Sequence, residues 1–337
     1  MDRVDKTLHA VNRNGRGLEI GPSYNPVVSK ASGARVETVD HATRDELVAK
    51  YRGFGLGQEQ LDRIEEVDHI WHGGSLLNVV PEHGVYDYIV ASHFIEHTVD
   101  LIGFLQDCES LLNETGQLAL VVPDKRFCFD RFQPLSTLGS VIDSHHAAQA
   151  FHSAGPLVDH QAYACTNNSV IAWSRDAPGP LAVQFPHLEG AAEAELNGAA
   201  QEEYFDIHRW KFTPASFDLL IRDLAVLGHH QFGIVESFGT EGFEFFVTLG
   251  KDAPADPAAD RLAALLRIED EVAAVHAEVA IGPKPPESLD DLQAENAKLR
   301  REVDELRAST SWRVTQPLRA ASAGMRRVRH RAGRRIS

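Results

Sequence analysis

The chain has 337 residues, of which 43% are hydrophobic and 24% are charged, and its formal net charge is −16. This length suits one large domain with appendages, and the composition excludes a chain that is disordered or collagen-like as a whole. The negative charge excludes a nucleic-acid-binding role for the whole protein, because an acidic body repels a polyanion. Eight arginines and no acid lie in residues 313–337, so the C-terminal end is a local exception.

The cysteines and the hydropathy pattern indicate a cytoplasmic protein. The three cysteines, Cys108, Cys128 and Cys165, form no CxxC motif, which argues against a disulfide framework and against a cysteine zinc site. No apolar run reaches the roughly 18 residues that a membrane span needs. The N-terminal residues also lack the apolar core of a signal peptide.

Short apolar runs alternate with helical segments in the first 124 residues. We expect strands at 17–22, 34–42, 69–74, 85–93 and 117–124, and helices at 44–52, 58–66 and 98–112. Such alternation predicts a Rossmann-like α/β fold with helices on both faces of a parallel sheet. Ligands of this fold bind beyond the carboxyl ends of the strands, so strand-end residues are the candidates for function.

The second half of the predicted domain departs from this rhythm. Residues 126–205 are rich in His, Asn, Gly and Pro and are predicted to be a substrate-facing insertion. A helix follows at 213–228, with Thr213 as its cap and Pro214 at its first position. Strands at 230–238 and 242–250, joined by a turn at 239–241, form an antiparallel hairpin. The prediction is a seven-stranded, mostly parallel sheet that ends in this hairpin.

Residues after 250 are predicted to form a helical extension of the domain at 1–250. A linker and helix occupy 251–287, a short coiled coil 288–308 and a basic tail 309–337. The heptad pattern at 289–306 places Asn296 among apolar core positions, which is typical of a two-stranded coiled coil and predicts a homodimer. A single solvated helix is the alternative, because the pattern is shorter than the usual 3–4 heptads.

Three residues near the first two strands fit a nucleoside site. Gly21 ends the first strand at a sharp bend where a backbone can approach a ligand, and Glu19 precedes it in that strand. Asp40 ends the second strand, about 20 residues further on, where an acid binds ribose hydroxyls in nucleotide-binding sheets.

Five parts of the sequence form a recognisable set: LEIGPSYNP at 18–26, VETVDHA at 36–42, GGSLLN at 73–78, YDYIVASHFIEH at 86–97 and the final hairpin. Together they resemble class I S-adenosylmethionine (SAM)-dependent methyltransferases. The PDKR-xx-FD segment at 123–130 resembles the branch associated with bacterial cell-envelope glycan synthesis. The resemblance covers roughly residues 10–250. A dinucleotide oxidoreductase fits less well, because no GxGxxG follows the first strand.

The resemblance implies SAM as cofactor and assigns its contacts by position. Glu19 and Gly21 line the methionine end, and Asp40 binds the ribose. By the same resemblance, Ser75 and Leu76 are assigned to the adenine. Ser92 and His93 are assigned to the edge of the fourth strand.

Methyl transfer to a hydroxyl needs a group that takes the proton. The candidate catalytic residues are His93, His97, Asp124, Asp130 and His208, and Arg126 is a candidate for holding an anionic group of the acceptor.

His93, Glu96 and His97 have two interpretations. Glu96 and His97 cap and pack the cofactor floor, or all three bind a divalent metal that lowers the pKa of the acceptor hydroxyl. The segment is similar to the E-x-x-E-H metal segment of small-RNA 2′-O-methyltransferases, with a His in place of the first Glu. A fourth ligand would come from His145, His146 or His160.

The predicted function is O-methylation of a sugar hydroxyl in a polysaccharide or its precursor. The alternative is a non-catalytic scaffold for envelope glycan enzymes, and O versus N transfer stays open. No specific nucleic-acid partner is expected. The tail at 313–337 resembles tails of envelope glycan enzymes and predicts contact with an anionic membrane face, the inner face in this case. A solubilising or RNA-binding end is the alternative.

Overall fold

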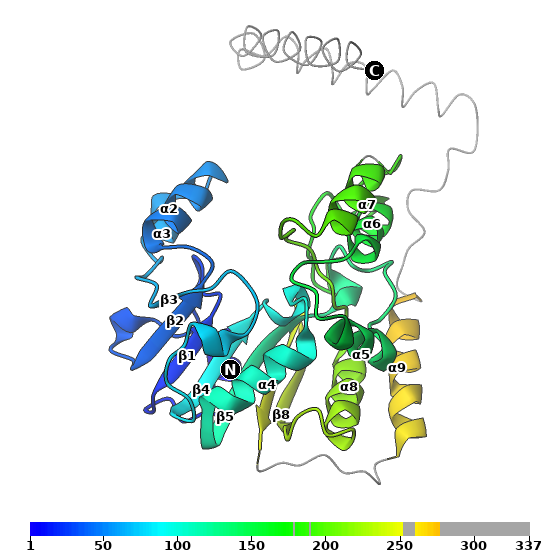
Figure 1. Cartoon of the computed structure of the whole chain (residues 1–337). Coiled ribbons are helices and arrows are strands. Elements are labelled where there is room, and N and C mark those ends of the chain that lie inside the picture. The colour runs from blue at the N-terminus through cyan, green and yellow to red at the C-terminus, as the bar shows by residue number, and fades with distance from the viewer. Residues whose placement is uncertain (178, 189, 252–259, 277–337) are drawn as a thin grey trace, which may run out of the picture. The chain divides into compact units, whose positions relative to one another are not determined.

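A seven-stranded sheet forms the centre of the computed structural model, which describes residues 1–177, 179–188, 190–251 and 260–276 (Figure 1). Its strands follow the spatial order β3-β2-β1-β4-β5-β9-β8. They are β1 (Gly17–Ile20), β2 (Val36–Asp40), β3 (His69–Ile70), β4 (Tyr86–Ser92), β5 (Leu112–Pro123), β8 (Gly233–Glu241) and β9 (Glu244–Gly250). The first five pair in parallel, and β9 pairs antiparallel with both β5 and β8. The predicted fold class is confirmed.

The final hairpin turns later than the sequence indicated. The predicted turn at 239–241 belongs to strand β8, and the turn comprises residues 242–243. Gly242 adopts a φ of 64°, a backbone conformation that glycine reaches without the steric cost of a Cβ atom. The glycine that sets the turn is therefore Gly242 rather than Gly239.

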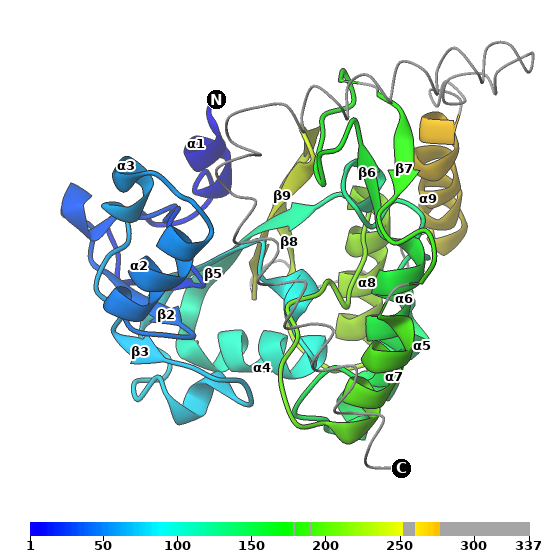
Figure 2. The same ribbon diagram turned by 90° about the horizontal axis from the view of Figure 1, so that it is seen from above.

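Helices surround the sheet on both faces and at one end. They are α1 (Arg3–Thr7), α2 (Arg44–Gly53), α3 (Gln58–Leu61), α4 (Leu101–Leu111), α5 (Leu138–Ala147), α6 (Ala154–Tyr163), α7 (Ala191–Ala200), α8 (Pro214–Val226) and α9 (Arg261–His276). Four short 3₁₀ helices are η1 (Lys30–Ser32), η2 (Leu76–Asn78), η3 (Ile95–His97) and η4 (Lys125–Phe127). Figures 1 and 2 show α2 and α3 beside β2 and β3, with α5 to α9 at the other end of the sheet.

The insertion at 126–205 contains α5, α6, α7 and a small hairpin of β6 (Cys165–Asn167) and β7 (Leu181–Val183). Its path did not follow from the sequence, because polar residues without periodicity give no helix or strand signal. After it, α8 begins as predicted: the Thr213 side chain accepts the N–H of Ser216, and Pro214 is the first helical residue. The predicted coiled coil at 288–308 and the tail at 309–337 lie outside the described residues.

Alternating side chains of the central strands build two hydrophobic clusters. Ile89 and Ala91 of β4 point into the larger cluster, which α4 and α8 cover, whereas Tyr88 and Val90 point into a smaller one. Leu8 and Val11, from the segment that follows α1, complete the smaller cluster. Because both faces are covered, the strands read as nearly continuous apolar runs.

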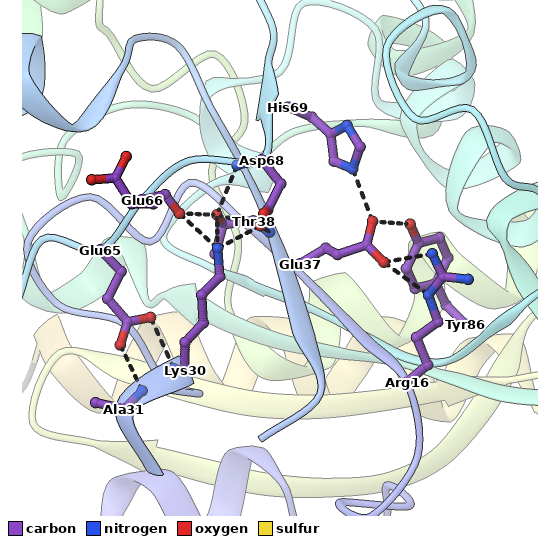
Figure 3. A network of polar contacts seen from close by, with 10 residues as sticks. All are labelled: Arg16, Lys30, Ala31, Glu37, Thr38, Glu65, Glu66, Asp68, His69 and Tyr86. Carbon is purple, nitrogen blue, oxygen red and sulfur yellow. Dashed lines mark hydrogen bonds and ion pairs between the residues drawn. The ribbon is translucent and has the colours of Figure 1, made fainter. Parts of the chain in front are cut away.

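A network of polar contacts fixes strand β2 between its neighbours (Figure 3). The Glu37 carboxylate accepts hydrogen bonds from Arg16 Nε at 2.8 Å and from the Tyr86 hydroxyl at 2.9 Å, and it lies 3.0 Å from His69 Nε2. One residue further, the Thr38 N–H donates to Asp68 at 2.7 Å. These bonds join β2 to segments on both sides and so set the position of its last residue, Asp40.

Candidate active site

The bend after β1 packs closely against the segment after β4. Gly21 has a φ of 68°, and a Cβ atom at this position would lie 2.9 Å from Cδ2 of Phe94. Glu19, two residues earlier, is buried, and its carboxylate accepts the N–H groups of Val27 at 2.6 Å and Val28 at 2.9 Å. Burial raises the pKa of Glu19 to about 7. Glu19 therefore holds the loop after the bend, and any effect on a cofactor passes through that loop.

Asp40 lies beside this bend, where the sequence placed it. Its side chain is only 2% exposed and accepts the backbone N–H of Ser23 at 2.9 Å and that of His41 at 2.8 Å. The His41 imidazole Nδ1 lies 2.7 Å from the same carboxylate. Asp40 and Ser23 also line a small cavity of about 10 Å³, with Pro22 among its walls. The acid and the bend thus form one site at the carboxyl ends of β1 and β2.

Trp71, which the sequence analysis did not single out, lies next to Asp40. Its backbone N–H donates to the Asp40 carbonyl at 2.9 Å, and its ring centroid lies 5.6 Å from that of Phe94. The indole N–H of Trp71 is buried without a hydrogen-bond partner within the described residues. An unpartnered donor, a carboxylate and a glycine bend fit the adenosine portion of SAM, which offers ring nitrogens and two ribose hydroxyls.

Ser75 and Leu76, predicted at the adenine, are bonded to helix α4 in this structure. The Ser75 hydroxyl donates to Asp107 at 3.0 Å, and the Leu76 N–H donates to the same carboxylate at 2.7 Å. The Leu76 side chain is buried in the larger hydrophobic cluster. The assignment of Ser75 and Leu76 to the adenine stays a prediction, and Trp71 is a second candidate for that contact.

Ser92 and His93, at the end of β4, are held by the N-terminal helix and by β9. Arg3 of α1 donates to the Ser92 hydroxyl at 2.8 Å and to the carboxylate of Glu244 at 2.8 Å. His93 Nε2 lies 2.7 Å from Glu244, and His93 adopts a φ of 50°. Its other ring nitrogen lies 3.6 Å from Glu96. His93 thus lies at the edge of the site, with Nε2 toward Glu244 and Nδ1 toward Glu96.

Asp124 and Arg126, predicted to meet the acceptor, form a buried ion pair. The Asp124 side chain is fully buried, and Arg126 Nη2 donates to it at 2.5 Å. The Thr240 hydroxyl also donates to Asp124, at 2.6 Å, and Arg126 Nη1 donates to the carbonyl of Glu271 in α9, at 2.9 Å. This arrangement joins η4, β8 and α9.

Five residues gather beyond the carboxyl ends of β4 and β5, and we call them the histidine–carboxylate cluster: Glu96, His97, Asp130, Asp206 and His208. His97 Nε2 lies 3.6 Å from Glu96 Oε1, and His208 Nε2 lies 3.9 Å from the same oxygen. The two rings meet edge to face, with centroids 4.7 Å apart. Asp206 lies 2.9 Å from His97 Nδ1, and Asp130 contacts His208 Nδ1.

The charges of the cluster shift the pKa values of its members. Burial disfavours protonation of His97, but the hydrogen bond to Asp206 and the nearby Glu96 carboxylate raise its pKa above the usual value. Burial would raise the pKa of Asp130, yet the contact with His208 lowers it. The contact with His97 likewise lowers the pKa of Asp206, so Asp206 and Asp130 both stay ionised and favour a proton on the Nδ1 atom that each contacts.

Backbone hydrogen bonds bring His208 to Glu96 across 112 positions of sequence. The N–H groups of Arg209 and Trp210 both donate to the Glu96 carbonyl, at 2.7 and 3.0 Å. The Trp210 indole donates to the Thr98 carbonyl at 2.7 Å, and its ring is buried in the hydrophobic core. The sequence indicated a functional His208, but not its connection to Glu96.

The other predicted histidines lie outside the cluster. His145 contacts Asp100 at 2.9 Å, and His160 packs edge to face against Phe129. Among the described residues, the groups whose ligand atoms converge within 4.8 Å include Glu96, His97 and His208, and no such group includes His93. The structure therefore adds His208 to the group that the sequence predicted, and His93 Nδ1 still lies 3.6 Å from Glu96.

The model of a methyltransferase domain family matches residues 1–168. This part of the chain belongs to that methyltransferase family. The match and the strand order support a SAM-dependent methyltransferase of the class I fold, and thus an enzyme. No significant match was found among curated protein sequences.

Several solved structures are similar to the methyltransferase. The CcbJ methyltransferase from Streptomyces caelestis is 11% identical, with a TM-score of 0.38 over 74% of this chain and 96% of that chain. A SAM-dependent methyltransferase from Aquifex aeolicus is 11% identical, with a TM-score of 0.35 over 73% and 88%. The 1,6-didemethyltoxoflavin-N1-methyltransferase from Burkholderia thailandensis is 14% identical, with a TM-score of 0.36 over 73% and 74%.

Among the described residues of the methyltransferase, no helix combines the length and the apolar character that a membrane crossing needs.

Proposed function

We propose that the methyltransferase transfers a methyl group from SAM to a sugar hydroxyl of a polysaccharide or its precursor. The observation that carries the proposal is the histidine–carboxylate cluster at the carboxyl ends of β4 and β5. A neutral hydroxyl is a weak nucleophile, so a group that takes its proton is needed as the new bond forms. Glu96 suits this role, because its carboxylate is buried and neither oxygen has a hydrogen-bond partner within the described residues.

The residues of this chain divide the work between cofactor and acceptor. Asp40, Trp71 and the bend at Gly21 would hold the adenosine portion of SAM, which supplies an electrophilic methyl group on a sulfonium sulfur. The acceptor oxygen gives its proton to Glu96 and forms a bond to the methyl carbon. The C–S bond breaks and its electron pair stays on sulfur. His97 and His208 stabilise the charge on Glu96 before the proton arrives.

Polar groups of the insertion support a polyhydroxylated acceptor. Within the insertion, buried atoms without a hydrogen-bond partner among the described residues include both ring nitrogens of His152 and Nδ1 of His160, and Nε of Arg209, just after the insertion, is a further such atom. Buried polar atoms normally find partners, so these atoms are available to a ligand that brings many donors and acceptors. A sugar does so, and the insertion lies beside the histidine–carboxylate cluster through Phe129, which packs on both His160 and His208.

The test has two stages. Isothermal titration of the full chain with SAM should show saturable binding. Radiolabel from methyl-labelled SAM should then appear on at least one nucleotide-linked, lipid-linked or polymeric sugar, and Glu96→Gln should abolish transfer while SAM still binds. Exposed Glu59→Gln is the matched control. Transfer to amines with none to hydroxyls would contradict the proposal, as would full activity of the Glu96 variant.

We also propose that the enzyme works at the inner membrane face, with residues 313–337 contacting anionic lipid and residues 289–306 forming a homodimer. The eight arginines of that tail support the first part, since each basic residue near an anionic surface contributes about 1 kcal/mol. Co-sedimentation of the full chain with vesicles containing phosphatidylglycerol should be lost when 313–337 are deleted. Equal sedimentation of the full and the shortened chain would refute the membrane contact. The dimer has its own test, because a monomeric mass of the full chain in sedimentation velocity would refute it.

A further inference from the structure

Two imidazoles of the cluster present equivalent nitrogens to one carboxylate oxygen. Nε2 of His97 and Nε2 of His208 lie 3.6 and 3.9 Å from Glu96 Oε1. These separations are too long for hydrogen bonds. Ligand atoms of one tetrahedral zinc ion lie roughly 3.3 Å apart, because each bond is about 2.0–2.1 Å long. The ligand atoms of Glu96, His97 and His208 all lie within 4.8 Å of one another, so they could move together around one ion.

The opposite sides of both rings carry the contacts that metal-binding histidines show. His97 Nδ1 lies 2.9 Å from Asp206, and His208 Nδ1 contacts Asp130. Asp130 is itself held by Gln133, whose Nε2 donates to it at 2.7 Å. A carboxylate on Nδ1 places the ring proton there and leaves Nε2 as a neutral, more basic ligand. Both rings therefore have a carboxylate beside Nδ1 and Nε2 on the side of Glu96.

The burial of Glu96 is a second, independent observation. Its side chain is 0% exposed, and neither carboxylate oxygen has a hydrogen-bond partner within the described residues. A buried ionised carboxylate costs several kcal/mol unless a positive charge or hydrogen bonds compensate it. A divalent cation between Glu96 and the two imidazoles supplies that compensation.

We propose that Glu96, His97 and His208 bind one divalent transition-metal ion and that the acceptor hydroxyl occupies the open coordination position. This inference deepens the proposed function and rests on it. Two imidazoles and one carboxylate form a donor set of the kind that catalytic zinc sites use, with one position left for substrate. A bound ion would lower the pKa of the acceptor hydroxyl, and Glu96 Oε2, which has no hydrogen-bond partner within the described residues, would take the proton.

A neighbouring group of potential ligands, Cys128, Asp130 and His208, is a weaker candidate. Cys128 Sγ donates to Asp130 at 3.5 Å, and Asp130 already contacts His208 Nδ1. Its three members thus satisfy one another. We assign them to the support of His208.

The experiment uses the full chain after treatment with a chelator and dialysis. Titration with Zn²⁺, Mn²⁺ or Co²⁺ salts should reveal one site per chain, and Co²⁺ should give the visible absorption of a low-symmetry nitrogen–oxygen site. His97→Ala and His208→Ala should remove the site. Exposed His83→Ala should bind as the parent does and serves as the matched control.

Asp206→Asn provides a variant with little risk of misfolding, because the Asp206 side chain is 75% exposed. Loss of its contact with His97 Nδ1 should weaken metal binding about 10–100-fold. Absence of a site in the parent, or equal affinity in His208→Ala and parent, would overturn the inference. Metal binding without transfer to any sugar would overturn the proposed function instead, and transfer that persists undiminished after chelation would overturn the role of the ion.

Discussion

Ser23 donates its backbone N–H to the Asp40 carboxylate at 2.9 Å, so the bend after β1 rests directly on the acid that ends β2. Ser23 adopts a φ of 48° to make this contact. A carboxylate offers roughly four acceptor positions, and Ser23 and His41 make four contacts with Asp40, including one from the Ser23 hydroxyl at 3.5 Å. We expect ribose hydroxyls to replace some of these contacts when SAM binds, so SAM affinity should depend on Asp40.

Replacing Asp40 with Ala should weaken SAM binding about 10–100-fold, because hydrogen bonds to a charged group contribute about 1.5–3 kcal/mol. Isothermal titration measures this directly. Asp45→Ala is the control, since the Asp45 side chain is 97% exposed at the start of α2. Unchanged affinity in Asp40→Ala would remove Asp40 from the cofactor site.

Replacing Glu19 with Gln should lower the free energy of unfolding by about 1–3 kcal/mol. Each Glu19 oxygen accepts one backbone N–H, from Val27 and from Val28, and a glutamine amide group would set a donor against one of these donors. Urea unfolding followed by circular dichroism gives the measurement. The exposed Glu59→Gln variant should stay within about 0.5 kcal/mol of the parent. Equal stability of the Glu19 variant would mean that the loop is held by other contacts.

The sequence predicts the frame of the site because apolar periodicity and glycine bends are local signals. Gly21 and Asp40 end consecutive parallel strands, so the topology alone brings them together. Ser75 and Leu76 show the limit of this reasoning. Their partner is Asp107 on α4, and a helix face that meets a loop across 31 residues leaves no local pattern.

Four of the five members of the histidine–carboxylate cluster were predicted from the sequence, but Asp206 and the arrangement of the cluster were not. The sequence identified four titratable candidates near predicted strand ends, where ligands of this fold bind: Glu96, His97, Asp130 and His208. His208 joins Glu96 only through the backbone bonds of Arg209 and Trp210, after an insertion without periodicity. His93 was grouped with Glu96 by helical spacing, yet its positive φ and Glu244 draw its ring toward β9.

Replacing Asp124 with Asn should cost about 3 kcal/mol of unfolding free energy, because it breaks a fully buried ion pair with Arg126. Urea unfolding would show this as a lower midpoint. Asp5→Asn provides a comparison, since Asp5 pairs with Arg13 where both side chains are 45–49% exposed, and such pairs contribute less than about 1 kcal/mol. Similar losses in the two variants would show that burial does not strengthen the Asp124 pair.

His230 should make the protein less stable as the pH falls from 6.5 toward 4. Burial, with His229 nearby, lowers the pKa of His230 to about 4, whereas its ordinary value is 6.5. Between pH 6.5 and 4, His230 is protonated in the unfolded chain but not in the folded one. The free energy of unfolding therefore falls by up to about 1.4 kcal/mol per pH unit. His230→Asn keeps an acceptor for the Phe232 N–H, which His230 Nδ1 accepts at 3.1 Å, and an asparagine cannot be protonated in this pH range.

The measurement is the free energy of unfolding in urea at several pH values. Its dependence on pH should be weaker for His230→Asn than for the parent, while exposed His83→Asn should keep the parent's dependence. Parallel curves for parent and His230→Asn would show that His230 titrates in the folded protein as it does in the unfolded chain.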